Sequence, residues 1–243
     1  MSTITRTFTP VLGKRIRVTA LDNCGRPPED SVDNAVAVTD GFITVTLSAE
    51  VEEGTEIVVK KADGSLCVNE RLASSFKNFT IETEYCGVDP GVLSLTTNAE
   101  IYENYASVAA GIVIPEGKID KRYALELWTG LSGAACAEDV EEASGYMLLP
   151  YVQAGVVSGL TVDGENSVSF TVTGSYTKGG NGWGVGPYDV LDDGGTPSPL
   201  PTALDPLDHF LLIETGIAPP PVLNGLYSIT ASGTTTTTTT TGA

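Results

Sequence analysis

Alternation of apolar and polar residues with a period of two restricts the fold of this 243-residue chain more than any other feature of its sequence. Such alternation is typical of strands that bury one face. Only 18 % of the residues are charged, and the 27 glycines and many threonines favour strands and turns over exposed helices. We therefore expect a mainly β fold, a β-sandwich or barrel of about eight to ten strands. The strand candidates are residues 11–20, 41–50, 76–86, 121–130, 144–157, 167–176 and 208–216.

One short helix is expected to flank these strands, within residues 88–98. There Asp89 precedes Pro90, which suits an N-cap followed by proline at the first helical position. Pro150 interrupts the apolar run 144–157, and because proline lacks an N–H group it indicates a sheet edge or a bulge.

A hairpin is expected from residues 41–50 pairing with residues 53–61. Residues 62–66 come next and contain Asp-Gly, a strong turn signal. Acidic side chains gather around the connection between the two predicted strands. They are Glu50, Glu52, Glu53 and Glu56.

The sequence divides into two parts by composition. Residues 1–216 are expected to form one domain, which includes a long Gly/Pro-rich loop at 178–207. Prolines and a run of threonines dominate the last 27 residues, so we expect a Pro/Thr-rich C-terminal extension at 217–243.

The net charge of −18 restricts the possible partners. After Arg122 the only basic residue is Lys178, against thirteen acidic residues. Such a surface repels DNA phosphates and anionic membranes instead of binding them. We find neither a secretory signal nor a run of the roughly 20 apolar residues that a membrane span needs, and expect no membrane partner.

Residues 179–190, GGNGWGVGPYDV, resemble a phosphate-binding loop only in glycine content. No lysine follows the glycines, and the downstream aspartates place negative charge where a phosphate would lie. We interpret the stretch as a connection whose glycines permit unusual backbone angles. Trp183 and Tyr188 would anchor it in a core or against a neighbouring subunit.

Nothing in the sequence indicates catalysis, a metal or a cofactor. His209 is the only histidine, and no Gly-x-Ser-x-Gly motif is present. Asp189, Asp192 and Asp193 lack EF-hand spacing, so a solvated acidic loop is favoured over a calcium site. We expect the four cysteines to be buried thiols. They are Cys24, Cys67, Cys86 and Cys136.

An ordered set of sequence segments across residues 8 to 220 resembles the major tail proteins, or tail tube subunits, of long-tailed phages that infect actinobacteria. The segments are GKRIRVTALDNCGRP, EYCGVDPGVLSLTT, ALELWTG, GYMLLPYVQAG, GNGWGVGPYDV and PSPLPTALDPLDHFLL. The threonine run departs from this pattern.

The resemblance implies a tail-tube-type β-sandwich with one flanking helix and long loops or arms. Its subunits form rings, usually hexameric, that stack into a hollow tube for genomic DNA, with an arm reaching the next ring. Other tail proteins (tape measure, tail terminator and distal tail protein) would be its partners. The chain would be assembled in the host cytoplasm and reside in the virion tail.

The resemblance also suggests roles for individual residues, as hypotheses. Arg15 and Arg17, with Arg6 and Lys14, would neutralise acids across a subunit interface. Trp183 and Tyr188 would anchor self-assembly, and residues 21–40 and 50–56 would contact the next ring. Because a tube lumen is typically negative, it would be lined by Glu50, Glu52, Glu53 and Glu56.

Two other classes of function stay open at this point. One is a virion decoration or minor tail protein, a β-sandwich module that binds carbohydrate or a cell surface through exposed aromatic residues. The other is a hydrolase whose paired carboxylates are distant in sequence, because any two acids can converge in space.

Overall fold

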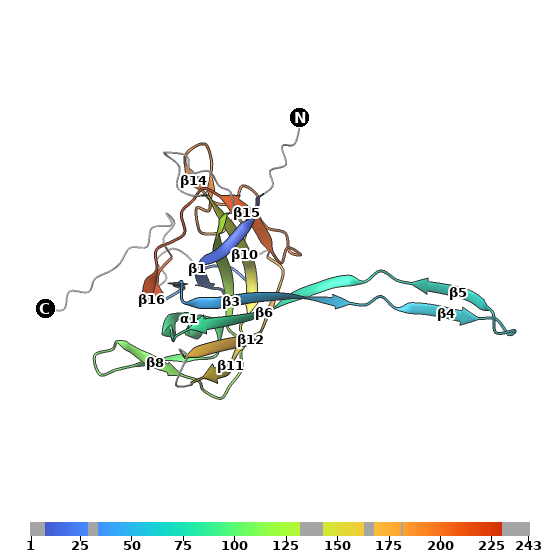
Figure 1. The fold of residues 1–243 in the computed structure, drawn as a ribbon, viewed down its shortest axis with the longest axis horizontal. Helices are drawn as coiled ribbons and strands as arrows, with labels where there is room; N and C mark the ends of the chain where they lie inside the picture. Colours follow the sequence, from blue (N-terminus) through green and yellow to red (C-terminus); the bar gives the residue numbers. More distant parts are fainter. Residues whose placement is uncertain (1–7, 29–33, 132–142, 163–167, 181, 230–243) are drawn as a thin grey trace.

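The computed structural model of the protein describes residues 8–28, 34–131, 143–162, 168–180 and 182–229. Within them the chain forms sixteen strands and one helix, which confirms the mainly β fold (Figure 1). The main sheet comprises β1 (Pro10–Ala20), β2 (Val36–Thr39), β3 (Phe42–Glu52), β6 (Ser75–Cys86), β9 (Arg122–Leu131), β10 (Ser144–Gln153), β11 (Val156–Thr161), β12 (Ser169–Thr177), β15 (Leu211–Thr215) and β16 (Leu223–Tyr227).

Three separate two-stranded hairpins account for the other strands. They are β4 (Glu56–Lys60) with β5 (Leu66–Arg71), β7 (Glu100–Glu103) with β8 (Ala109–Val113), and β13 (Leu191–Asp192) with β14 (Pro197–Ser198). The helix, α1, spans Pro90–Thr96.

The main sheet has the order β16-β2-β1-β9-β10-β12-β6-β3, with β15 also paired to β10 and β11 to β12. The sheet changes layer at β10, whose first half pairs with β15 and whose end pairs with β12 through Val152 and Gln153. Pro150 lies between the two halves, where the register to β9 shifts between Leu149 and Val152. The bulge predicted from Pro150 is therefore confirmed, and the sheet folds into two layers.

Both faces of the β1–β9 pair are buried, each against a different core. The inner core lies between the two layers and beneath α1. It includes Ile16, Val18, Ile81, Tyr85, Leu93, Tyr123, Leu125, Leu149 and Val152. The outer core lies on the opposite face of β1, β9 and β10. It includes Val38, Trp128, Tyr146, Leu148, Trp183, Tyr188, Val190, Leu200 and Ile229.

Helix α1 begins as the sequence predicts. The Asp89 side chain accepts hydrogen bonds from the backbone N–H groups of Gly91 (3.0 Å) and Val92 (3.2 Å), and Pro90 occupies the first turn. These bonds satisfy donors that a helix start leaves unpaired. Val92 and Leu93 then bury the helix against the inner core.

The folded body extends past the predicted boundary at residue 216. Strand β16 pairs with β2, Leu226 packs on the inner core, and Ile229 is buried in the outer core. Residues 217–229 therefore belong to the same fold, while the threonine run lies outside the described residues.

The predicted pairing of residues 41–50 with 53–61 is wrong. Strand β3 pairs with β6 over its whole length, and β4 pairs with β5 farther along the same two chain segments. The Asp63-Gly64 turn closes this longer hairpin, which confirms the turn at 62–66. The local sequence pattern does not reveal the error, because the apolar and polar residues of β4 alternate in a way that also allows pairing with β3.

The predicted burial of the cysteines is wrong for three positions. Cys24, Cys67 and Cys86 are exposed. Cys136 lies outside the described residues.

Candidate assembly surfaces

A long two-stranded arm projects from the body on one side (Figure 1). It consists of the distal parts of β3 and β6 and of the β4–β5 hairpin. Every residue of β4 and β5 is exposed. An isolated two-stranded hairpin is marginally stable in water, so such an arm gains from packing on another surface.

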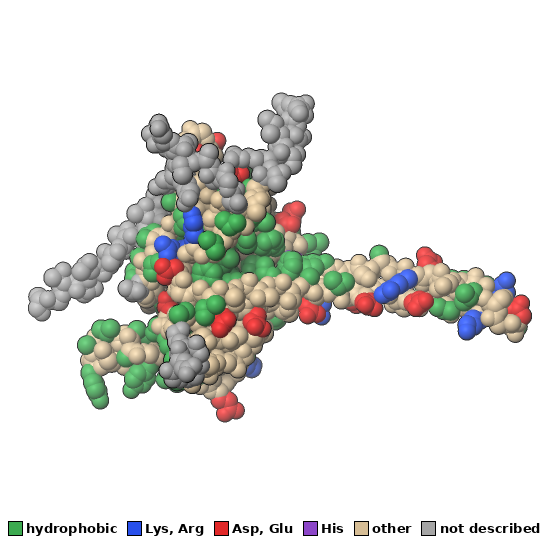
Figure 2. Space-filling model, in the orientation of Figure 1, with side chains coloured by type: hydrophobic (Ala, Val, Ile, Leu, Met, Phe, Trp, Pro, Cys, Tyr) green, Lys and Arg blue, Asp and Glu red, His purple; other side chains and the backbone are tan. Residues whose placement is uncertain are grey.

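The β4–β5 hairpin has one apolar face. Its register places Ile57 opposite Glu70 and Val59 opposite Val68, so these side chains share a face. The register then shifts and pairs Leu66 with Lys60, away from this face. Ile57, Val59 and Val68 are 39–46 % exposed. We call these three residues the arm stripe. Figure 2 shows green apolar patches on the arm between red and blue charged groups.

The four predicted lumen glutamates lie where the arm leaves the body. Glu50 pairs with Asn78 at the end of the β3–β6 ladder, and Glu52 pairs with Ser75. Glu53 accepts a 3.1 Å hydrogen bond from Arg71, and Glu56 lies opposite Arg71 in the β4–β5 register. The structure thus joins Glu53 to Arg71 and places Glu56 opposite the same base. Whether any of the four faces a channel stays a prediction.

The outward face of the β3–β6–β12 layer carries a second group of acids. Glu84 lies between Thr44 on β3 and Thr171 on β12, and Glu82 lies opposite Thr46. Side chains alternate between the two sides of these strands. Those on the inner side fill the inner core, and those on the outer side carry hydroxyl and carboxylate groups. We call Thr44, Thr46, Ser48, Thr80, Glu82, Glu84, Thr171 and Thr173 the polar face.

Sequence reasoning identified the alternation on these strands but did not select Glu82 or Glu84. The signal was available in FKNFTIETEYC, where Glu82 and Glu84 take alternate positions opposite the buried Ile81, Thr83 and Tyr85.

The β7–β8 hairpin projects at the other end of the long axis from the arm (Figure 1). Tyr102, Tyr105 and Val108 are strongly exposed on it, and Figure 2 shows it largely covered by green side chains. Beside it lies a hollow of about 440 Å³. Its lining includes Pro90 of α1, Ile101, Glu103 and Val108 of the hairpin, and Leu226 of β16.

A buried ion pair lies in the outer core. Arg17 on β1 and Glu126 on β9 are cross-strand partners. The Arg17 Nε and Nη2 atoms donate to the two Glu126 carboxylate oxygens at 2.5 and 2.6 Å. Tyr146 donates to the same carboxylate at 2.7 Å, and Glu126 is completely buried. The bidentate geometry makes this a strong, oriented contact.

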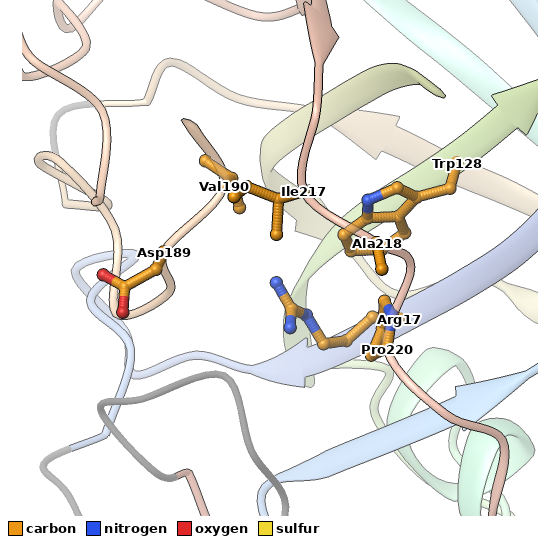
Figure 3. Close-up of a pocket in the computed structure, with 7 residues that line it drawn as sticks. All are labelled: Arg17, Trp128, Asp189, Val190, Ile217, Ala218 and Pro220. Atoms are coloured by element: carbon orange, nitrogen blue, oxygen red, sulfur yellow. The ribbon is translucent and has the colours of Figure 1, made fainter. Parts of the chain in front are cut away.

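Aromatic rings enclose the guanidinium group. It lies 3.4 Å from the ring centroid of Tyr188 and 4.9 Å from that of Trp128. The Tyr188 hydroxyl forms a 2.9 Å hydrogen bond with Thr19. Arg17 and Trp128 also line a small cavity of about 40 Å³ beside Ile217 and Ala218 (Figure 3). The contact between Arg17 and Tyr188 therefore holds the 178–207 loop against the sheet.

The environment of this pair shifts three pKa values. Burial alone would lower the pKa of Arg17, but the Glu126 carboxylate and its hydrogen bonds raise it on balance. Burial and then Glu126 raise the pKa of Tyr146 well above its ordinary value. Burial raises the pKa of Tyr188 to about 12, against the opposing effect of Arg17. Both tyrosines therefore stay neutral at physiological pH.

Three of the predicted assembly residues lie inside their own chain. Arg17, Trp183 and Tyr188 are all buried there, and their role in self-assembly stays a prediction. Trp183 does anchor the glycine-rich loop, as the sequence indicates. Gly184 and Gly186 adopt positive φ angles of 63° and 85° beside it.

Arg15 remains compatible with an interface role. Its Nη1 donates to Asp40 within the chain at 2.8 Å, and its side chain is 25 % exposed. Arg6 lies outside the described residues.

His209 shares a 2.8 Å hydrogen bond with Thr177 and packs edge-on against Phe76. Among the described residues, no three His, Cys, Asp or Glu side chains gather closely enough to hold a metal ion. The same residues contain no helix long and apolar enough to cross a membrane.

Comparison with known proteins adds no family. No protein-family model matches the chain, and no curated protein matches it either. Its function is therefore inferred from the sequence and from the surfaces described above.

Proposed function

We propose that the chain is a structural virion protein, a tail tube subunit that assembles with copies of itself into stacked hexameric rings. The observation that carries the proposal is the arm formed by residues 42–86. It leaves a well-packed body and exposes the arm stripe along its distal half. Exposed apolar residues on a projecting hairpin favour contact with another protein surface. The resemblance to tail tube subunits in the sequence supports the same function.

The polar face suits the wall of a channel for DNA. Glu82 and Glu84 lie among threonines on a sheet face whose opposite side is the inner core. Carboxylates repel phosphates, and hydroxyl groups offer only weak, exchangeable contacts with a passing duplex. The net charge of −18 acts in the same direction. Genomic DNA would therefore pass without specific binding.

In this function the chain needs no cofactor and catalyses no reaction. It would assemble in the host cytoplasm and then reside in the virion tail. Its other partners would be the tape measure, tail terminator and distal tail proteins.

Electron microscopy of the purified chain tests the proposal. Negative-stain images are recorded over a range of concentrations, and we expect rings or tubes with a central hole. A matched variant replaces residues 53–74 with a short glycine turn between β3 and β6. It should keep the fold of the body, seen by circular dichroism, and form no tubes.

The contrary result is equally clear. A chain that stays monomeric at high concentration, also when mixed with the other tail proteins, and that binds polysaccharide would contradict the tube. It would support a decoration or minor tail module instead.

A further inference from the structure

The arm and the hollow beside β7–β8 have complementary properties. The arm ends in a tight turn at residues 61–65, in which Lys61 N–H donates to Ser65 and Gly64 N–H donates to Lys61. Residues 62–65 carry small side chains, so the tip is narrow. Lys60 and Lys61 lie exposed at its start, and the exposed Leu66 comes directly after it.

The hollow offers the matching groups. Ile101, Val108 and Leu226 supply an apolar lining, and Glu103 adds a carboxylate to it. Its volume of about 440 Å³ lies within the usual range for binding pockets. Lys61 would thus meet Glu103 while Leu66 meets apolar side chains.

Geometry decides which molecule can fill the hollow. The arm and the β7–β8 hairpin project in opposite directions from the body (Figure 1). The tip therefore does not reach the hollow of its own chain. The same tip on a second copy is narrow and basic, and these properties complement the hollow and its carboxylate.

We propose that the arm tip of one copy, residues 60–66, docks in the hollow beside β7–β8 of the next copy. The contact is heterologous, since two different surfaces meet, and so it repeats in one direction. This inference rests on the proposed function and names the partner surface of the arm. The arm stripe would pack along the exposed Tyr102 and Val108.

Disulfide trapping tests the contact directly. Ala62 at the tip and Ala109 in the lining of the hollow are replaced by cysteine in one chain, with Cys24, Cys67, Cys86 and Cys136 changed to Ser. Mild oxidation should give a ladder of dimers, trimers and higher species on a non-reducing gel. Ala62→Cys alone and Ala109→Cys alone are matched controls, and each should stop at the dimer.

A charge exchange tests the same contact without cysteines. Lys61→Glu and Glu103→Lys should each lower the association constant, measured by sedimentation, by about tenfold or more. The combined variant should regain most of it. Asp193→Lys makes the same change of charge as Glu103→Lys on a different exposed loop, and it should leave association unchanged.

The outcomes separate this contact from the tube itself. Tubes without a ladder, and with no effect of Lys61→Glu or Glu103→Lys, would overturn the contact and leave the tube standing. A ladder from a preparation that forms neither rings nor tubes would support the contact and contradict the tube. Polysaccharide binding at Tyr102 and Tyr105 without self-association would overturn both.

Discussion

The body and the arm each contain an arginine opposite a glutamate on neighbouring antiparallel strands. In the body, Arg17 faces Glu126 beneath two aromatic rings, and both side chains are buried. On the arm, Arg71 faces Glu56 and donates to Glu53, and both partners of that bond are more than half exposed. The arginine–glutamate pair thus stabilises a core in the body, whereas on the arm it lies on an exposed surface. Burial, more than the pairing itself, decides what the charge does.

Breaking the buried pair gives the largest expected effect. Arg17→Met leaves the Glu126 carboxylate buried without its cation, and should lower the free energy of unfolding by about 3–5 kcal/mol. Urea denaturation followed by fluorescence measures this loss. The double variant Arg17→Met/Glu126→Leu removes both charges and should recover most of the stability. If Arg17→Met alone changed stability by less than about 1 kcal/mol, the buried pair would not have the role assigned to it.

The buried tyrosines give the next effect, which depends on pH. Burial raises the pKa of Tyr123 and of Tyr188 to about 12, while an unfolded tyrosine ionises near pH 10. Their contribution is therefore complete below about pH 10 and is lost as pH rises toward 12. Each should cost up to about 1.4 kcal/mol of stability by pH 11. Urea midpoints measured between pH 8 and pH 11 test this, and a flat profile would contradict it.

A smaller effect is expected at the start of α1. Asp89→Ala removes the acceptor for two backbone N–H groups and should cost about 1 kcal/mol. Asp89→Asn keeps an acceptor and is the matched control. Thermal unfolding of the two variants distinguishes them, and equal losses would show that the cap contributes little.

The smallest effect on folding is expected at Arg71. Arg71→Met removes the exposed contact with Glu53 and should change the free energy of unfolding by less than about 1 kcal/mol. Set beside Arg17→Met under identical conditions, it measures what burial adds to an arginine–glutamate pair. A loss as large as that of Arg17→Met would remove the distinction between the body and the arm.

Local patterns were sufficient to predict the class of fold, the start of α1 and the bulge at Pro150. Each depends on neighbours along the chain: alternation in strands such as 76–86, Asp89 before Pro90, and a proline without an N–H group. The arm was missed because the choice between β4 and β6 as the partner of β3 depends on contacts distant in sequence.

The assembly residues show the same limit. The sequence predicts Arg17 at a subunit interface and Tyr188 either in a core or against a neighbouring subunit, because nothing nearby in sequence indicates Glu126 or Thr19 as a partner. Both faces of β1 are buried, and this becomes apparent only once residues 183–200 fold back over the sheet. Glu82 and Glu84 could have been selected, since their positions follow from alternation alone.

The exposed arm also affects what proteolysis does to a free subunit. Lys60, Lys61 and Arg71 all lie exposed along it, within reach of a protease with trypsin-like specificity. A cut there would leave the pairing of β3 with β6 and both cores in place, so the nicked chain would keep its fold. If the arm tip makes the link to the next copy, such a chain would still receive an arm in its hollow yet offer none. It would act as a chain terminator, and a few damaged copies would be enough to limit the length of an assembly.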